Sequence, residues 1–399
     1  MLINEATRDF IRQHANDDVR RLALQGTKSE EVDLTQALQQ IAGRQTARRK
    51  LPSWAEVDDI VYPPHLNMEQ CSSEQTARYK AKMVNGHSFV DLTGGFGVDF
   101  YWMSQGFEQR AYVEQNAELC AIAEHNFQQL GLDCSVNCCS TATYLTEMDH
   151  ADAVFLDPAR RNEHGGRTYS IEDCSPNVLE LLPILMEKAD KIVLKLSPML
   201  DWRKAVNDLQ RVTEVHIVSV DNECKELLLV LGKETTGNLR LICVNDEQRL
   251  EIVPKVGIFH SQAGNFSFPR WESKAPSSAS LFLYEPNASV MKAGCFAELA
   301  ARYPVSQVAV NSHLFLSSVE MEDFPGRGFQ IMSISSMNKK EISEKLNAIK
   351  SANIAVRNFP MTADQLRKKL KLKDGGATYI FATTDQEGCH KLYICRKIG

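Results

Sequence analysis

The chain of 399 residues is 43% hydrophobic and 24% charged, with a formal net charge of −6. About two to four domains are expected, because one small hydrophobic core does not serve a chain of this length. The net negative charge argues against a protein that wraps nucleic acid over its whole surface, but it does not exclude local basic patches.

The eleven cysteines are scattered and form no C-x-x-C pair. This pattern favours reduced thiols over a disulfide framework or a zinc knuckle, so we expect no metal. The first residues, MLINEATRDF, lack the apolar run of a signal peptide, and no stretch approaches about 18 uncharged apolar residues. We therefore expect a cytoplasmic protein that does not enter a membrane.

Residues 1–70 are predicted to form a helical region, because apolar residues such as Leu34, Leu38 and Ile41 recur at helical spacing. The run RQTARRK at 44–50 carries four cations, which fits a solvated helix face or a phosphate contact. Ser72 or Ser73 is expected to cap the next helix, and we place a domain boundary after residue 70.

Residues 71–235 alternate strands and helices. Strands are expected at 89–91, 111–114, 134–137, 153–156, 192–196, 216–220 and 226–231. A helix before the fifth strand is expected to begin at Ser175-Pro176. Strict alternation predicts a parallel sheet covered on both faces, with ligands at the carboxyl ends of the strands.

The segment SFVDLTGGFGVD at 88–99 predicts a strand, a glycine turn and a helix N-terminus. Such a turn presents backbone N–H groups and a helix dipole to a ligand. A dinucleotide motif needs a third glycine where Phe100 stands. Asp91 before the turn instead suits the zwitterionic tail of an amino acid.

Glu114 follows Gly95 by 19 residues, at the end of the next predicted strand. A carboxylate there can accept both hydroxyls of a ribose. The alternative is an acidic strand end exposed to solvent.

These features resemble the first motif of the class I S-adenosylmethionine-dependent methyltransferases, which implies their Rossmann-like α/β sheet. The resemblance implies that the methionine part of the cofactor contacts the turn and that Glu114 binds the ribose. Ser140 occupies the position that contacts the adenine in this fold. The expected cofactor-binding residues are Asp91, Thr93, Gly94, Gly95, Gly97, Glu114 and Ser140.

The sequence LDPARR at 156–161 follows the fourth predicted strand. A proline after a strand-terminal acid fixes the backbone, so that the Asp157 carboxylate and the Pro158 carbonyl can both orient a target amine. An ordinary Asp-Pro turn is the alternative. The segment resembles the D-P-P-[YFW] motif of amino-methyltransferases and the D-P-P-R motif of RNA uridine C5-methyltransferases, without matching either. The fifth strand ends without the cysteine of the second family, which disfavours C5 methylation.

Three cations near these strand ends are expected to meet RNA phosphates: Arg160, Arg161 and Lys195. Lys195 stands in an otherwise apolar strand, so it either extends to solvent at the strand end or faces an anion in the cleft.

Residues 236–328 are predicted to form a β-rich, ferredoxin-like linker domain, with strands at 239–244 and 281–284, a helix at 288–303 and a turn at Pro325–Gly328. Residues 329–399 are predicted to form a small α+β domain. Its elements are expected at 330–334, 339–350, 355–359, 362–370, 378–382 and 392–396.

A basic run at 367–373 includes Arg367, Lys368 and Lys369, and it could follow a phosphate backbone or cover a solvated helix end. The surrounding stretch resembles the THUMP-like domain at the C-terminus of a bacterial methyltransferase family. That resemblance, which extends over the whole chain, implies an RNA partner such as tRNA or rRNA.

Together these features predict an S-adenosylmethionine-dependent methyltransferase that acts on a base nitrogen of structured RNA. Two alternatives stay open. One is a methyltransferase for a protein or a small molecule, and the other is a non-catalytic RNA-binding protein that retains the fold.

Overall fold

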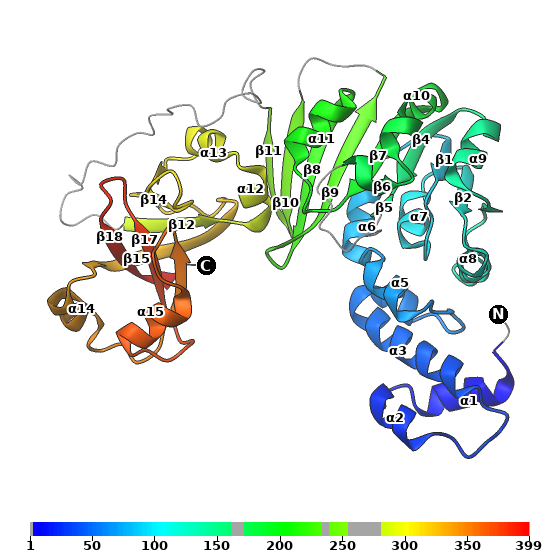
Figure 1. Ribbon diagram of the computed structural model, residues 1–399, viewed down its shortest axis with the longest axis horizontal. Coiled ribbons are helices and arrows are strands. Elements are labelled where there is room, and N and C mark those ends of the chain that lie inside the picture. Colours follow the sequence, from blue (N-terminus) through cyan, green and yellow to red (C-terminus); the bar gives the residue numbers. More distant parts are fainter. Residues whose placement is uncertain (1–2, 161–170, 234–238, 254–280, 399) are drawn as a thin grey trace. The chain divides into compact units, whose positions relative to one another are not determined.

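The computed structural model describes residues 3–160, 171–233, 239–253 and 281–398 (Figure 1). The chain forms two compact units. The first consists of Met1–Thr213 and Leu228–Thr236, and the second of Glu214–Leu227 and Gly237–Gly399. The domain boundaries placed after residues 70, 235 and 328 stay predictions.

The first unit begins with helices, as predicted for residues 1–70. Their bounds are α1 (Glu5–Gln13), α2 (Val19–Gln25), α3 (Leu34–Lys50), α4 (Pro52–Ala55), α5 (His65–Gln70) and α6 (Glu74–Ala81). Side-chain oxygens of Asn4, Asp18, Asp33 and Ser73 accept hydrogen bonds from the first turns of α1, α2, α3 and α6. Ser73, rather than Ser72, therefore caps α6.

The basic run at 44–50 lies at the end of α3, and most of its cations have local partners. Arg44 pairs with Asp58 at 3.1 Å, and Arg48 donates to the Asn16 side chain. Lys50 donates to two backbone carbonyls. These contacts favour a structural role for the run over a phosphate contact.

Among the described residues, no helix has the length and apolar character needed to cross a bilayer.

A largely parallel set of strands in the order β9-β7-β4-β1-β2-β3 belongs to the first unit, except that the first half of β9 is assigned to the second unit. The bounds are β1 (Ser88–Asp91), β2 (Gln109–Glu114), β3 (Ser135–Cys138), β4 (Ala151–Leu156), β7 (Ala189–Leu196) and β9 (Glu223–Gly232). The helices of this part are α7 (Val98–Met103), α8 (Ala117–Gln129), α9 (Thr141–Glu147), α10 (Val178–Lys188) and α11 (Trp202–Leu209). β1 pairs in parallel with both β2 and β4, so their carboxyl ends meet at one edge.

An aromatic core lies between these strands and helices α7 and α8. Phe89 of β1 and Tyr112 of β2 pack with Phe100 of α7 and Phe127 of α8, and all four are fully buried. The rings of Phe100 and Phe127 lie 5.1 Å apart. Phe100, which replaces the third glycine of a dinucleotide motif, is therefore a core residue that anchors α7.

A short ribbon follows β4. β5 (Ala159–Arg160) pairs antiparallel with β6 (Cys174–Ser175), after a 3-10 turn at Ile171–Asp173. The predicted helix start at Ser175-Pro176 is wrong, because Ser175 belongs to this ribbon and Asn177 caps α10.

The second unit contains β10 (Arg240–Asn245), parallel to β8 (Val212–Val220) and antiparallel to β11 (Gln248–Ile252). It also contains a seven-stranded sheet in the order β13-β14-β12-β15-β18-β17-β16. The strand bounds are β12 (Leu281–Pro286), β13 (Ser306–Gln307), β14 (Phe315–Ser317), β15 (Gly326–Ser336), β16 (Asn353–Arg357), β17 (Thr378–Thr384) and β18 (His390–Lys397). The helices are α12 (Ala288–Ala293), α13 (Phe296–Arg302), α14 (Lys339–Leu346) and α15 (Ala363–Leu370).

Two glycines correct the predictions for this unit. The helix predicted at 288–303 is interrupted by Gly294, whose φ of +65° ends α12 before α13 begins. Of the turn predicted at Pro325–Gly328, the residues from Gly326 onward instead begin β15. A Cβ atom on Gly326 would lie 2.1 Å from the Glu285 carbonyl oxygen, so glycine permits the close approach of β12 and β15.

Glu285 joins distant strands of this sheet. Its side chain is 4% exposed and pairs with Arg327 of β15 and with Arg357 of β16, the latter at 2.8 Å. Two guanidinium groups thus share one buried carboxylate.

Glu285→Gln should lower the free energy of unfolding of the second unit by about 2 kcal/mol, because an amide cannot balance two guanidinium groups. The arginine side chains are 45% and 39% exposed, so partial rehydration limits the loss. Differential scanning calorimetry measures the effect, with the exposed Glu320→Gln as control. An unchanged unfolding transition in Glu285→Gln would contradict the role of the carboxylate.

Candidate functional site

The glycine turn at 93–97 is held tightly against β2. Gly94 N–H donates to the Val113 carbonyl at 2.9 Å, and the Tyr112 hydroxyl donates to the Gly95 carbonyl at 2.5 Å. A Cβ atom on Gly94 would lie 2.0 Å from the Tyr112 ring. Gly95, with φ of +55°, has open space on its Cβ side, where the nearest atom would be 3.8 Å away. The turn is packed on one side and accessible at Gly95.

The N-terminal helices support the turn from another side. The Phe96 ring lies 5.1 Å from the Trp54 ring and 6.4 Å from the Tyr62 ring. Gly97 packs against Phe127, since a Cβ atom there would lie 2.6 Å from that ring. These contacts fix the conformation of the turn before any ligand arrives.

Asp91 is buried directly below the turn, with 1% of its surface exposed. Its Oδ1 accepts a hydrogen bond from Thr93 N–H at 2.9 Å, while its Oδ2 has no partner among the described residues. Burial raises the pKa of Asp91 well above its usual range, and the nearby carboxylates of Asp99, Asp157 and Glu114 add to the rise. An unpartnered buried oxygen of this kind is a ready acceptor for a cationic donor.

Glu114, at the end of β2, is bonded to the turn itself. Its Oε2 accepts from Gly95 N–H at 3.0 Å, and its Oε1 accepts from Asn116 N–H at 2.8 Å. Each carboxylate oxygen keeps capacity for a second donor. The predicted proximity of Glu114 to the glycine turn is therefore present in the structure.

Asp157 lies at the carboxyl end of β4, next to β1. Its N–H donates to the Thr93 hydroxyl oxygen at 2.6 Å, and its carboxylate forms an ion pair with Lys195 of β7. Burial raises the pKa of Asp157, and the Lys195 ammonium opposes that rise. Of the two possibilities for Lys195, the structure shows the second: it faces an anion, which is Asp157.

A buried ion pair beside the turn was not predicted. Lys80 of α6 is fully buried, lies 3.1 Å from the Asp99 carboxylate and donates to the Ser72 hydroxyl at 3.0 Å, while Ser72 donates to Asp99 at 2.7 Å. The position of Lys80 between Ala77 and Ala81, on the apolar stripe of α6, is the sequence signal that could have revealed it.

The strand ends therefore gather more negative than positive groups. Among the described residues, Asp91 senses the charges of Asp99, Asp157 and Glu114, and the compensating ammonium groups are Lys80 and Lys195. The imbalance favours a ligand that carries positive charge.

The remaining predicted site residues of this unit are placed as follows. Ser140 caps α9, where its hydroxyl oxygen accepts from Thr143 N–H, and the neighbouring Thr141 hydroxyl donates to the Leu92 carbonyl at 2.8 Å. Arg160 lies in β5, and Arg161 lies outside the described residues.

The second basic run lies in the other unit, on α15 and the loop after it. Arg367 is paired with Asp364 and Asp374, so this cation is neutralised locally. Lys368 and Lys369 are exposed.

Within the described residues, three potential metal ligands lie close together: Asp385, Glu387 and Cys389, on the turn between β17 and β18. Asp385 Oδ1 accepts two backbone N–H groups of that turn, so a structural role accounts for it. The expectation of no metal stays a prediction.

Comparisons with known proteins identify the fold class and two domains of the chain. The sequence matches the family model of a ferredoxin-like domain over residues 282–325 and that of a THUMP domain-like module over residues 326–397. The chain has a Rossmann-like class I methyltransferase sheet, preceded by helices and followed by ferredoxin-like and THUMP-like domains. The predicted fold class is confirmed.

The structure is similar over its whole length to the crystal structure of a putative methyltransferase from Porphyromonas gingivalis, with 28% identity, 100% of each chain covered and a TM-score of 0.86. Two more distant structures share 43% of this chain. They are TrmK of M. capricolum with S-adenosyl-homocysteine (13% identity, 70% of that chain, TM-score 0.31) and the 16S rRNA methyltransferase RsmC of T. thermophilus with AdoMet and guanosine (12%, 46%, 0.34). No curated protein matches the sequence.

Gly94→Ala should destabilise the first unit by about 3 kcal/mol, because its methyl group would overlap the Tyr112 ring. Gly106→Ala is the matched control, since a Cβ atom there meets nothing within 4 Å. Thermal unfolding followed by circular dichroism separates the two. Equal transitions for both variants would contradict the packing of the turn.

Asp91→Asn should stabilise the unliganded protein at neutral pH by about 1–3 kcal/mol, because an amide neither buries a charge nor takes up a proton on folding. The folded pKa of Asp91 lies above the unfolded one, so the native state loses stability as pH rises through the folded pKa. The advantage of Asp91→Asn should therefore grow as pH rises above about 4. Unfolding by urea across pH measures it, with the exposed Asp133→Asn as control; a pH-independent difference would refute the assignment.

Proposed function

We propose that this protein is an S-adenosylmethionine-dependent methyltransferase that acts on a base nitrogen of structured RNA. The observation that carries the proposal is the convergence of Asp91, Glu114 and Asp157 around one glycine turn. Structural similarity over the full chain to the Porphyromonas gingivalis protein, which is described as a putative methyltransferase, supports the same activity.

The residues present fit the cofactor. S-adenosylmethionine supplies an activated methyl group on a positively charged sulfonium. The buried Oδ2 of Asp91 lacks a partner and would accept from the methionine amine beside the open face of Gly95. Thr93, Gly94 and Gly97 shape this seat, Glu114 would accept the ribose hydroxyls, and Ser140 would border the adenine.

Asp157 and Pro158 would orient the acceptor amine. The Thr93 hydroxyl holds the Asp157 backbone, and Lys195 holds its carboxylate, so the loop end is fixed from two sides. We assign Lys195 to this positioning role rather than to an RNA phosphate. Catalysis would rest on placing the nucleophile, because the methyl donor is already activated.

Charge distribution supports RNA as the substrate. Residues 326–397 contain 14 Lys and Arg against 6 Asp and Glu, a net charge of +8 in a chain whose total is −6. Lys368 and Lys369, with Lys371 and Lys373, are exposed in this segment. Such a basic module in an acidic chain is suited to a phosphate backbone. Arg160 and Arg161 would add contacts near the acceptor.

Asp157→Asn should reduce methyl transfer at least about a hundredfold, because the amide does not keep the ion pair with Lys195 or orient the amine. Tritiated methyl incorporation into total tRNA and rRNA, taken from cells that lack the protein, measures the activity. Mass spectrometry of the digested nucleosides identifies the modified base.

Two measurements sharpen the result. Calorimetry should show that Asp157→Asn still binds S-adenosylhomocysteine, whereas Asp91→Asn binds it at least tenfold more weakly. The exposed Asp149→Asn should match the wild type in both assays. Full methyl transfer by Asp157→Asn would refute the catalytic role of Asp157. A wild-type protein that does not bind S-adenosylhomocysteine would refute the proposal that the protein is a methyltransferase.

A further inference from the structure

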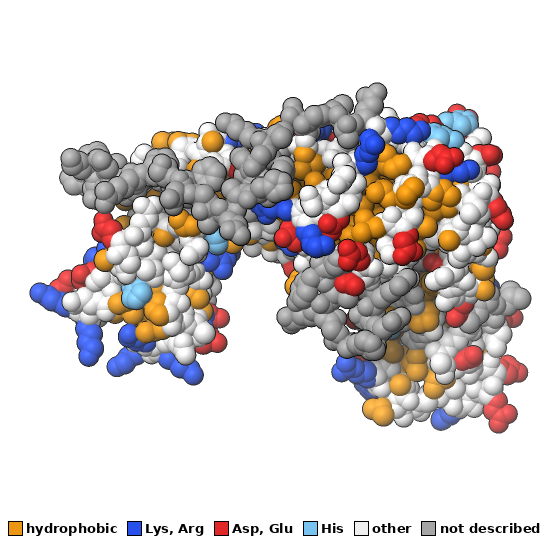
Figure 2. All heavy atoms as spheres, turned by 45° about the horizontal axis from the view of Figure 1, so that its top comes forward, with side chains coloured by type: hydrophobic (Ala, Val, Ile, Leu, Met, Phe, Trp, Pro, Cys, Tyr) orange, Lys and Arg blue, Asp and Glu red, His pale blue; other side chains and the backbone are white. Residues whose placement is uncertain are grey.

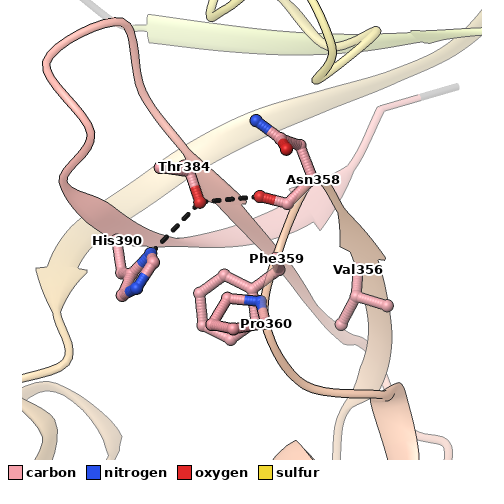
Figure 3. Close-up of a pocket in the computed structure, with 6 residues that line it drawn as sticks. All are labelled: Val356, Asn358, Phe359, Pro360, Thr384 and His390. Atoms are coloured by element: carbon pink, nitrogen blue, oxygen red, sulfur yellow. Dashed lines mark hydrogen bonds between the residues drawn. The ribbon is translucent and has the colours of Figure 1, made fainter.

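A cavity of about 580 Å³ lies on the THUMP-like module, and none of the site residues assigned above lines it. Six residues line it: Val356, Asn358, Phe359, Pro360, Thr384 and His390. In Figure 3 the Phe359 and Pro360 rings lie between His390 and Val356, while the Asn358 amide extends away from them. The volume falls within the usual range for small organic ligands.

Hydrogen bonds fix the frame of this cavity. Thr384 donates to the Asn358 carbonyl through its N–H at 3.1 Å and through its hydroxyl at 2.7 Å. The Thr384 hydroxyl oxygen also lies 3.1 Å from His390 Nδ1. A hydroxyl has one proton, which goes to the Asn358 carbonyl, so His390 Nδ1 must be the donor to Thr384. With the proton on Nδ1, the other ring nitrogen, Nε2, is available as an acceptor.

The aromatic lining is anchored as well. The half-buried Phe359 packs against the core under α14 and α15, and its ring centroid lies 5.2 Å from that of His390, at 65°. Pro360 and His390 are exposed. The cavity therefore offers a fixed apolar ring and an adjacent acceptor nitrogen to a flat ligand that carries N–H groups.

Lysine side chains lie around the hydrophobic core on which Phe359 packs. Helices α14 and α15 contribute to this core through residues such as Leu346 and Leu366. Exposed lysines follow these two helices and their loops: Lys339, Lys340, Lys345, Lys350, Lys368, Lys369, Lys371 and Lys373. Figure 2 shows a histidine among hydrophobic side chains in this unit, with Lys and Arg side chains along the adjoining edge.

We infer that this cavity binds one unpaired nucleobase of the RNA, while the surrounding lysines contact its phosphates. The base would stack on Phe359, and His390 Nε2 would accept from an amino or imino group on its edge. The inference rests on the proposed function only in taking RNA as the ligand. It adds a preference for an unpaired nucleotide, bound by residues other than those that would orient the methyl acceptor.

Fluorescence anisotropy on the full chain tests this with labelled RNA of about twelve nucleotides, either unpaired or as a blunt duplex. The wild type should bind the unpaired RNA more tightly. Phe359→Leu and His390→Ala should each weaken that binding about five- to tenfold, leave duplex binding unchanged and keep the slope of log affinity against log salt. Lys369→Ala should weaken both RNAs and lower the slope by about one.

The exposed His390→Ala guards against misfolding of Phe359→Leu, and Cys389→Ser, beside the cavity, should bind as the wild type does. Unchanged affinity in both cavity variants, or equal loss for both RNAs, would overturn the inference. A wild type that binds neither RNA would overturn it together with the RNA substrate. The expected binding pattern without methyl transfer to RNA would support the cavity and overturn the proposed function.

Discussion

A carboxylate held out of water at the end of β1 governs the first unit. Desolvation of Asp91 is only partly offset by the Thr93 N–H, and neighbouring carboxylates increase its cost. Nothing in the packing of β1 requires an acid there, since Phe89 and Val90 supply the apolar contacts of the strand. The fold thus retains a residue that weakens it, which is the usual signature of a site whose stability is completed by its ligand.

The residues around Asp91 form a rigid site in which its desolvated carboxylate can bind a ligand. The turn above it is packed against Tyr112, Phe127 and Trp54. Its N–H groups at 93–95 are hydrogen-bonded to protein oxygens, so the turn is held in one conformation. The buried pair of Lys80 and Asp99 adds a second fixed charge pair beside it. A ligand that enters this setting meets dipoles and charges already in place, which limits the reorganisation that binding requires.

Much of this arrangement could be predicted from the sequence, because it depends on short-range patterns. The strand-turn-helix at 88–99, the acid at Glu114 and the Asp-Pro pair at 157–158 each follow a strand end, and parallel strands bring their ends together. Contacts between distant segments were less accessible. The pairing of Lys195 with Asp157 depends on the order of β7 and β4, and the burial of Lys80 depends on how α6 packs against α7. The sequence around Gly326 predicts a turn, because neighbouring residues give no sign that β12 approaches this glycine closely.

The ion pairs of Glu285 with Arg327 and Arg357 determine where the second unit can be cut into stable fragments. Glu285 lies in the segment that matches the ferredoxin-like family, and both of its arginine partners lie in the THUMP-like segment. β12 of the first segment and β15 of the second are hydrogen-bonded neighbours over six residue pairs. A fragment cut at residue 326 would expose the edge of β15 and leave two arginines without their shared anion. We therefore expect the ferredoxin-like and THUMP-like segments to fold as one cooperative unit, so a cut at the family boundary should not yield a stable THUMP-like fragment.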